Sequence, residues 1–192
     1  MPSEGISLYH GSYAGIDEIE LDKCDDGKDF GKGFYLTPSK KPAVAFIRTS
    51  LAKAKTKHLI PADRDYGFVT EFEYQPVKGV KSYEFPSVGR DWLYYISINR
   101  RKALSEDLRP LLSQNFDCYD ILTGKIADDA TNTTLNAFLT GTFGPASDEA
   151  ATNFAIGLLL PNRLDNQVCF RTEKALACLK RIGCEKYVIG TN

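Results

Sequence analysis

Residues 29–37 read Asp-Phe-Gly-Lys-Gly-Phe-Tyr-Leu-Thr, and this stretch carries most of what the sequence says about the fold. The first four residues end a polar, glycine-containing loop, and the last five are predicted to form a short strand. Strand alternation places Tyr35 and the small Gly33 on one face, and Phe34 and Leu36 on the other. The second face is apolar and suits a core. The first offers an aromatic ring with space beside it, against which a planar ligand can stack.

The elements on either side of this stretch favour an α+β fold. Strands are expected at 7–12, 33–37, 68–74, 118–126, 167–172 and 186–189, and helices at 40–55, 91–103, 131–139, 148–160 and from 172 to near 183. This order lacks the regular strand–helix alternation of a doubly wound sheet. Gly31-Lys32-Gly33 is a G-x-G, but a strand follows it where a dinucleotide-binding loop would open a helix.

Length and charge set broad limits. The chain has 192 residues, which suits one domain over 1–192, and 24 basic residues nearly balance 25 acidic ones. No overall field therefore directs the protein to nucleic acid or to an anionic membrane. The first twelve residues lack the basic start and apolar run of a signal peptide, and the most apolar later stretch, 154–160, is too short to span a bilayer. We expect a cytoplasmic protein with no membrane partner.

Two local basic groups and five cysteines complete the composition. Lys53, Lys55, Lys57 and His58 form one basic group and residues 100–102 the other, and we interpret both as solvated helix faces. No cysteine pair has C-x-x-C spacing, and the chain has only two histidines. We therefore predict reduced structural thiols and no metal site.

Two further segments carry residue types that suit a ligand. His10-Gly11 ends a strand and presents an imidazole beside an unobstructed backbone, which can donate to and accept from a flat carboxamide at once. Gln167 begins a late strand, where its amide can hydrogen-bond a sugar hydroxyl. Taken alone, the first segment is better explained by an ordinary strand-to-turn exit, and the second indicates almost nothing.

Together the three segments resemble a known family. His10-Gly11, then Phe-Gly-Lys-Gly-Phe-Tyr-Leu-Thr at 30–37, then Gln167 are similar to the ADP-ribosyltransferase superfamily, on the branch shared with diphtheria toxin and the poly-ADP-ribose polymerases. That branch uses a His–Tyr–Glu triad and a stacking aromatic eleven residues after the tyrosine, which here is Phe46. The resemblance implies an ADP-ribosyltransferase-like split β-sheet core with peripheral helices.

The rest of the chain resembles a narrower bacterial group. Residues 91–93, 99–100, 120–129 and 166–179 look like those of a compact family of formerly unknown function that is grouped with the ADP-ribosyltransferases. Many of its members are encoded beside a small partner and are regarded as toxins of toxin–antitoxin or conflict systems. This resemblance implies a small cognate antitoxin protein as a partner.

The resemblance implies NAD⁺ as the substrate and gives each site residue a role. The catalytic positions are His10, Tyr35 and Gln167, and the cofactor-binding positions are Gly11, Ser12, Gly33, Phe34 and Phe46. Gly11 and Ser12 would hold the carboxamide, and Tyr35 and Phe46 would sandwich the nicotinamide ring. His10 would bind the adenosine ribose, and Gln167 would orient the nicotinamide ribose.

The sequence departs from the triad at its third position, and this changes the activity that we expect. Gln167 stands where the branch has glutamate, so it can bind a hydroxyl but cannot carry charge or take a proton at neutral pH. We therefore expect a mono-ADP-ribosyltransferase that cleaves NAD⁺ and modifies an unidentified macromolecule. The alternatives are a non-catalytic NAD⁺- or protein-binding module and an NAD⁺ glycohydrolase. RNA 2′-phosphotransfer is disfavoured because the chain has only two histidines.

Four charged residues each have two possible roles. Asp128 and Asp129 either supply an acidic group or cap the following helix, and Asp91 and Arg100 either line the cleft or serve the structure.

Overall fold

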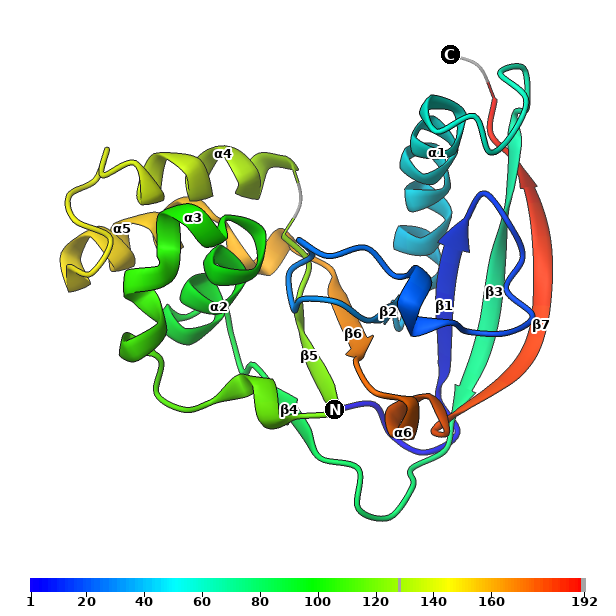
Figure 1. Ribbon diagram of the computed structural model, residues 1–192, viewed down its shortest axis with the longest axis horizontal. Coiled ribbons are helices and arrows are strands. Elements are labelled where there is room, and N and C mark those ends of the chain that lie inside the picture. The colour runs from blue at the N-terminus through cyan, green and yellow to red at the C-terminus, as the bar shows by residue number, and fades with distance from the viewer. Residues whose placement is uncertain (128, 191–192) are drawn as a thin grey trace.

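The computed structural model describes residues 1–127 and 129–190, without the side chains of Asp129 and Ala130. In that part of the chain, a three-stranded sheet has the order β1-β3-β7 and a four-stranded sheet the order β2-β6-β5-β4 (Figure 1). The strands are β1 (Ser7–Ser12), β2 (Phe34–Leu36), β3 (Tyr66–Tyr74), β4 (Ser82–Glu84), β5 (Ile121–Lys125), β6 (Asn166–Phe170) and β7 (Leu179–Val188).

Helices flank both sheets. The α-helices are α1 (Lys40–Thr56), α2 (Arg90–Arg100), α3 (Lys102–Ser105), α4 (Asp129–Leu139), α5 (Glu149–Leu158) and α6 (Glu173–Leu176). Short 3-10 turns lie at Leu21–Lys23, Glu106–Leu111, Phe116–Cys118 and Pro161–Arg163. The predicted α+β class is confirmed. Among the described helices, none is both long and apolar enough to cross a membrane.

The two sheets meet where β1 passes β2. Tyr9 and Thr37 form a bridge in which each N–H donates to the other's carbonyl oxygen at 2.9 Å. The apolar faces of both sheets pack together around Leu8, Phe34 and Phe170, which are nearly unexposed. Helix α1 covers the other face of the first sheet through Ile47 and its buried neighbours.

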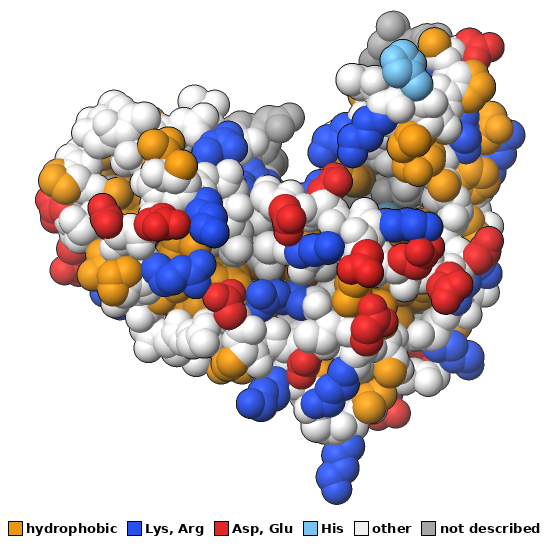
Figure 2. Space-filling model, in the orientation of Figure 1, with side chains coloured by type: hydrophobic (Ala, Val, Ile, Leu, Met, Phe, Trp, Pro, Cys, Tyr) orange, Lys and Arg blue, Asp and Glu red, His pale blue; other side chains and the backbone are white. Residues whose placement is uncertain are grey.

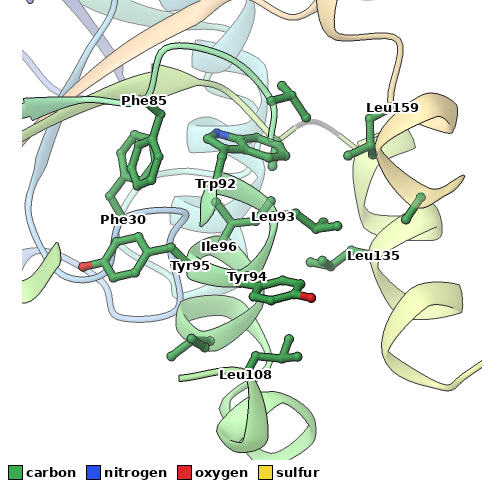
Figure 3. Close-up of a cluster of buried hydrophobic side chains, with 14 of the residues drawn as sticks. Phe30, Phe85, Trp92, Leu93, Tyr94, Tyr95, Ile96, Leu108, Leu135 and Leu159 are labelled. Carbon is green, nitrogen blue, oxygen red and sulfur yellow. The ribbon is translucent and has the colours of Figure 1, made fainter. Parts of the chain in front are cut away.

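A third core lies under the helices on the other side of the second sheet. It is centred on the consecutive buried residues 92–96 of α2 and receives Phe30 from the loop before β2. Figure 3 shows the ring of Phe30 beside that of Phe85, and the two centroids are 5.5 Å apart. The loop of residues 24–33 is therefore anchored in the core despite its polar sequence.

The last part of the fold differs from the prediction. The expected helix from 172 to near 183 is limited to α6, and β7 occupies 179–188 as an antiparallel partner of β3. Most side chains of β7 are exposed, because β7 is the edge strand of its sheet and is stabilised mainly by its backbone ladder. It therefore lacks the apolar alternation that predicts strands. The short β4, which pairs in parallel with β5, was missed for the same reason.

Candidate functional site

The predicted site residues come from elements that meet beside the junction of the two sheets. Figure 2 shows a deep notch between the lobe of α2–α5 and the lobe of α1, and β2 and β6 lie below this notch in Figure 1. The site residues are His10, Gly11 and Ser12 on β1, Gly33, Phe34 and Tyr35 at β2, Phe46 on α1, and Gln167 on β6. Because β1 bridges to the residue after β2 and β2 pairs with β6, residues from early and late parts of the chain are carried by one series of neighbouring strands.

His10 is held as a neutral ring. Its Nδ1 lies 2.8 Å from the carbonyl oxygen of Tyr35, and its ring stacks on Phe34 with centroids 4.6 Å apart. A carbonyl only accepts, so Nδ1 carries the proton. Burial lowers the pKa of His10 below its usual value. The hydrogen bond to Tyr35 acts in the opposite direction, and the positive charge of Lys28 lowers the pKa further. Nε2 is therefore left as an acceptor for a ligand hydroxyl.

Gly11 is required by a close approach of α1. A Cβ at this position would lie 1.7 Å from the carbonyl oxygen of Ala43, so no other residue fits without moving the helix. Tyr9 directs its N–H and C=O towards Thr37, and strand alternation directs those of Gly11 the same way, away from β3. A donor and an acceptor therefore face the gap beyond the Tyr9–Thr37 bridge. This is the arrangement that a planar carboxamide can pair with.

The other predicted contacts on β1 and β2 support their neighbours. The Ser12 hydroxyl lies 3.5 Å from that of Ser50, so it faces α1. Phe34 is 5% exposed and supports the ring of His10. A Cβ at Gly33 would lie 2.6 Å from Sγ of Cys169, so glycine lets the start of β2 pack closely on β6.

Tyr35 fastens the loop of residues 24–33 to β2. Its hydroxyl donates to the carbonyl oxygen of Gly31 at 2.7 Å and accepts from the N–H of Phe30 at 2.9 Å. Burial raises the pKa of Tyr35 well above its usual value, so the phenol stays neutral. Phe46 is exposed on α1, and Nζ of Lys28 lies 5.9 Å from the centre of its ring. The ring of Phe46 therefore faces this same loop.

Gln167 is buried and bound through its amide nitrogen. Nε2 donates to Oδ2 of Asp29 at 2.6 Å and to the carbonyl oxygen of Lys125 at 3.1 Å. Both partners are acceptors, which fixes the orientation of the amide. Oε1 is the opposite end of the group, and it forms no hydrogen bond with the described residues.

Asp29 and Arg100 form a buried ion pair behind Gln167. Nε of Arg100 lies 2.5 Å from Oδ1 of Asp29, and their side chains are 16% and 4% exposed. Oδ2 of Asp29 also accepts from the N–H of Ala127 at 2.8 Å. The remaining Arg100 nitrogens donate to Oδ1 of Asn132 at 2.6 Å and to the carbonyl oxygen of Ala127 at 2.5 Å. The pair thus ties the loop before β2 to α2, α4 and β6.

Sequence reasoning named Arg100 but missed its partner. Asp29 directly precedes the buried Phe30 in a glycine-containing loop. An acidic residue next to an apolar anchor was the feature of the sequence that could have indicated a buried carboxylate. Asp91 lies elsewhere, because its carboxylate accepts from the N–H and hydroxyl of Ser113 at 3.0 and 2.5 Å. Asp128 and the side chain of Asp129 lie outside the described residues.

Within the described residues, no three His, Cys, Asp or Glu side chains are grouped to hold a metal ion. The cysteines are free, and burial raises the pKa of Cys169 to about 12. Cys169 is therefore a protonated thiol within the core beneath Gly33.

A protein-family model matches most of the chain. The sequence model of a family described as a protein of unknown function (DUF3990) covers residues 6–181. The chain belongs to this family. The matched region includes every site residue named above, and the family description names no activity. Neither the curated proteins nor the solved structures contain a significant match to the chain.

Proposed function

We propose that this member of the DUF3990 family is an NAD⁺-dependent mono-ADP-ribosyltransferase with an ADP-ribosyltransferase-like split sheet. The observation that carries the proposal is the combination of His10 and Gly11 on β1. A neutral imidazole with a free acceptor nitrogen adjoins a backbone donor and acceptor at the gap between two sheets. Tyr35 of β2 and Phe46 of α1 each contact the loop of residues 24–33, Tyr35 through Phe30 and Gly31 and Phe46 through Lys28. These groups suit a ligand that has a carboxamide, an aromatic ring and ribose hydroxyls.

The reaction needs positioning more than a strong base. The bond between the ribose C1′ and the nicotinamide nitrogen breaks, and its electron pair leaves with neutral nicotinamide. A nucleophile of the acceptor then bonds to C1′ and releases its proton. The Gly11 backbone would fix the leaving group, and Nε2 of His10 would fix a ribose hydroxyl. C1′ would then face the acceptor while its bond to nicotinamide breaks.

The setting of Gln167 supports transfer of a single ADP-ribose. Its Nε2 is occupied by Asp29, which leaves Oε1 as an acceptor for a hydroxyl of the nicotinamide ribose. An amide oxygen orients that hydroxyl but does not remove its proton. Repeated extension of a chain, which needs an activated ribose hydroxyl as the acceptor, is not favoured by this residue.

The test follows nicotinamide release and target labelling together. Purified protein is incubated with cell extract and NAD⁺ labelled in its adenosine part. We expect nicotinamide release and a labelled macromolecule, identified by mass spectrometry. Absence of both NAD⁺ binding by calorimetry and nicotinamide release would exclude the proposal. Release with free ADP-ribose alone would identify a glycohydrolase, and NAD⁺ binding without release a non-catalytic binding module.

Two substitutions at Tyr35 separate its ring from its hydroxyl. Tyr35→Ala removes the ring and should abolish NAD⁺ binding. Tyr35→Phe keeps the ring and loses only the hydrogen bonds to Phe30 and Gly31, so it should bind NAD⁺ more weakly but measurably. Wild-type affinity in a folded Tyr35→Ala variant would count against this ring as a ligand contact.

The biological setting that we propose is a bacterial toxin that acts in the cytoplasm and is held inactive by a small cognate antitoxin. Expression of the wild-type chain should then arrest growth. A His10→Ala variant should relieve the arrest at equal protein level, and normal growth with wild-type protein would exclude the toxin role.

A further inference from the structure

Lys28 directly precedes the anchored part of the loop of residues 24–33. The next residue, Asp29, is held by Arg100 and Gln167, and Phe30 is fully buried. The N–H of Gly31 donates back to the carbonyl oxygen of Lys28 at 3.1 Å. The backbone of Lys28 is therefore preorganised, although the sequence around it is that of a polar loop.

The side chain of Lys28 reaches across to α1. Its Nζ lies 5.9 Å from the ring centre of Phe46, and its half-buried ammonium adjoins that of Lys53. Lys53 follows Phe46 by seven residues, which is two helical turns, so both lie on one face of α1. Burial, and after it the charge of Lys53, lowers the pKa of Lys28.

This arrangement leaves positive charge uncompensated. Asp25 lies 3.8 Å from Nζ of Lys28 and also 3.8 Å from Nζ of Lys57, so one half-exposed carboxylate serves two lysines. Within the described part of the chain, Lys53 forms no ion pair. Two neighbouring ammonium groups repel each other, and burial strengthens that repulsion. An anion between them would remove it.

We propose that Lys28 and Lys53 form a phosphate-binding subsite that receives the diphosphate of the nucleotide substrate. The identity of the nucleotide rests on the proposed function, whereas the attraction for an anion rests on the two lysines alone. The subsite continues the face of α1 that begins at Phe46. It is also close enough to His10 for the charge of Lys28 to lower the pKa of that ring. This assignment separates Lys53 from the other residues of the basic group, which keep their interpretation as a solvated face.

Inorganic pyrophosphate is the direct probe. We expect calorimetry at constant ionic strength to show binding to the wild-type protein, and Lys28→Gln and Lys53→Gln each to weaken it about tenfold or more. Lys55→Gln is the matched control, because Lys55 belongs to the same helix but lies on another face. Equal affinity in all four proteins, or no binding to any, would overturn the subsite.

A second readout does not depend on affinity. Saturating pyrophosphate should raise the pKa of His10, followed by NMR of its ring protons, because a bound anion offsets the charge of Lys28. Lys28→Gln should raise the same pKa without any ligand. An unchanged His10 pKa under saturating pyrophosphate would place the anion elsewhere and overturn the assignment.

Nicotinamide riboside separates this proposal from the proposed function, since it carries the ring and ribose but no phosphate. If it binds while pyrophosphate does not, the subsite is wrong and the NAD⁺ assignment stands. If pyrophosphate binds through both lysines while neither NAD⁺ nor the riboside binds, the anion site stands and the NAD⁺ assignment fails.

Discussion

Nε2 of Gln167 donates to Oδ2 of Asp29 over 2.6 Å, across 138 positions of sequence. Position 167 therefore requires a hydrogen-bond donor on the side that faces Asp29. Glutamate, the residue of the His–Tyr–Glu triad, would set a second carboxylate against Asp29 and the carbonyl oxygen of Lys125. Glutamine at this position is thus matched to its surroundings, and Asp29 is the residue that makes it so.

Glutamate at position 167 should destabilise the protein. Gln167→Glu replaces a donor by a charged acceptor beside Asp29, and we expect a loss of about 2–4 kcal/mol in the free energy of unfolding near neutral pH. The loss should shrink at about pH 5, where a protonated carboxyl can donate again. Urea denaturation at both pH values measures this. Gln167→Met is the control, because it removes the donor without adding charge, and equal stability of Gln167→Glu and wild type would contradict the network.

Breaking the buried ion pair from one side should be more damaging than removing both charges. Arg100→Met leaves the carboxylate of Asp29 buried without its cation, which should lower the free energy of unfolding by about 3–5 kcal/mol. Adding Asp29→Asn to this variant removes the uncompensated charge and should recover part of the loss. Thermal and chemical unfolding of the three variants give the coupling energy, and simple additivity of the two single changes would show that the residues act independently.

His10 should make stability depend on pH. Because its pKa is lower in the folded protein than the usual 6.5, the unfolded chain takes up the proton first as the solution is acidified. The contribution of the neutral ring is complete above pH 6.5 and is lost as the pH falls from there towards the folded pKa. Unfolding free energies measured through this range should fall in the wild type. His10→Gln should show a shallower fall, and parallel curves would contradict a ring that is held neutral in the folded protein.

Gly11 should not tolerate even a methyl group. Gly11→Ala places Cβ 1.7 Å from the carbonyl oxygen of Ala43, and displacement of α1 should cost about 3 kcal/mol or more. Gly183→Ala is the control, because its Cβ meets no atom within 4 Å and β7 is an edge strand. Comparable melting temperatures for the two variants would show that α1 does not pack as closely on β1 as described.

Local patterns explain which parts of the fold could be predicted. The helix expected at 40–55 is confirmed as α1 at Lys40–Thr56, and the strand expected at 7–12 is confirmed as β1, because each shows its periodicity within one segment. The edge strand β7 was mistaken for helix because its side chains are mostly exposed and its stability comes from pairing with β3. Its ladder partner lies about a hundred residues earlier in the chain and is invisible to any local window.

For the candidate site as well, local patterns predict residues within one segment but not contacts between distant segments. His10, Tyr35 and Gln167 were predicted as site residues from short motifs. In the structure, β2 pairs with β6, and β1 bridges to the residue that follows β2. The ion pair of Asp29 with Arg100 spans 71 positions and the contact of Asp29 with Gln167 spans 138, so neither has a spacing that sequence alone reveals. The pairing of Lys28 with Lys53 was hidden for a further reason, since like charges are not expected to meet unless something lies between them.

The pairing of β2 with β6 sets the stage of synthesis at which the candidate site can form. β1 and β3 can pair once Tyr74 has left the ribosome, but β2 forms its ladder with β6, which begins at Asn166. Tyr35 and Gln167 therefore come together only after a long nascent chain has been made with β2 unpaired. For a chain with the proposed activity, NAD⁺ could not be cleaved until synthesis has passed β6.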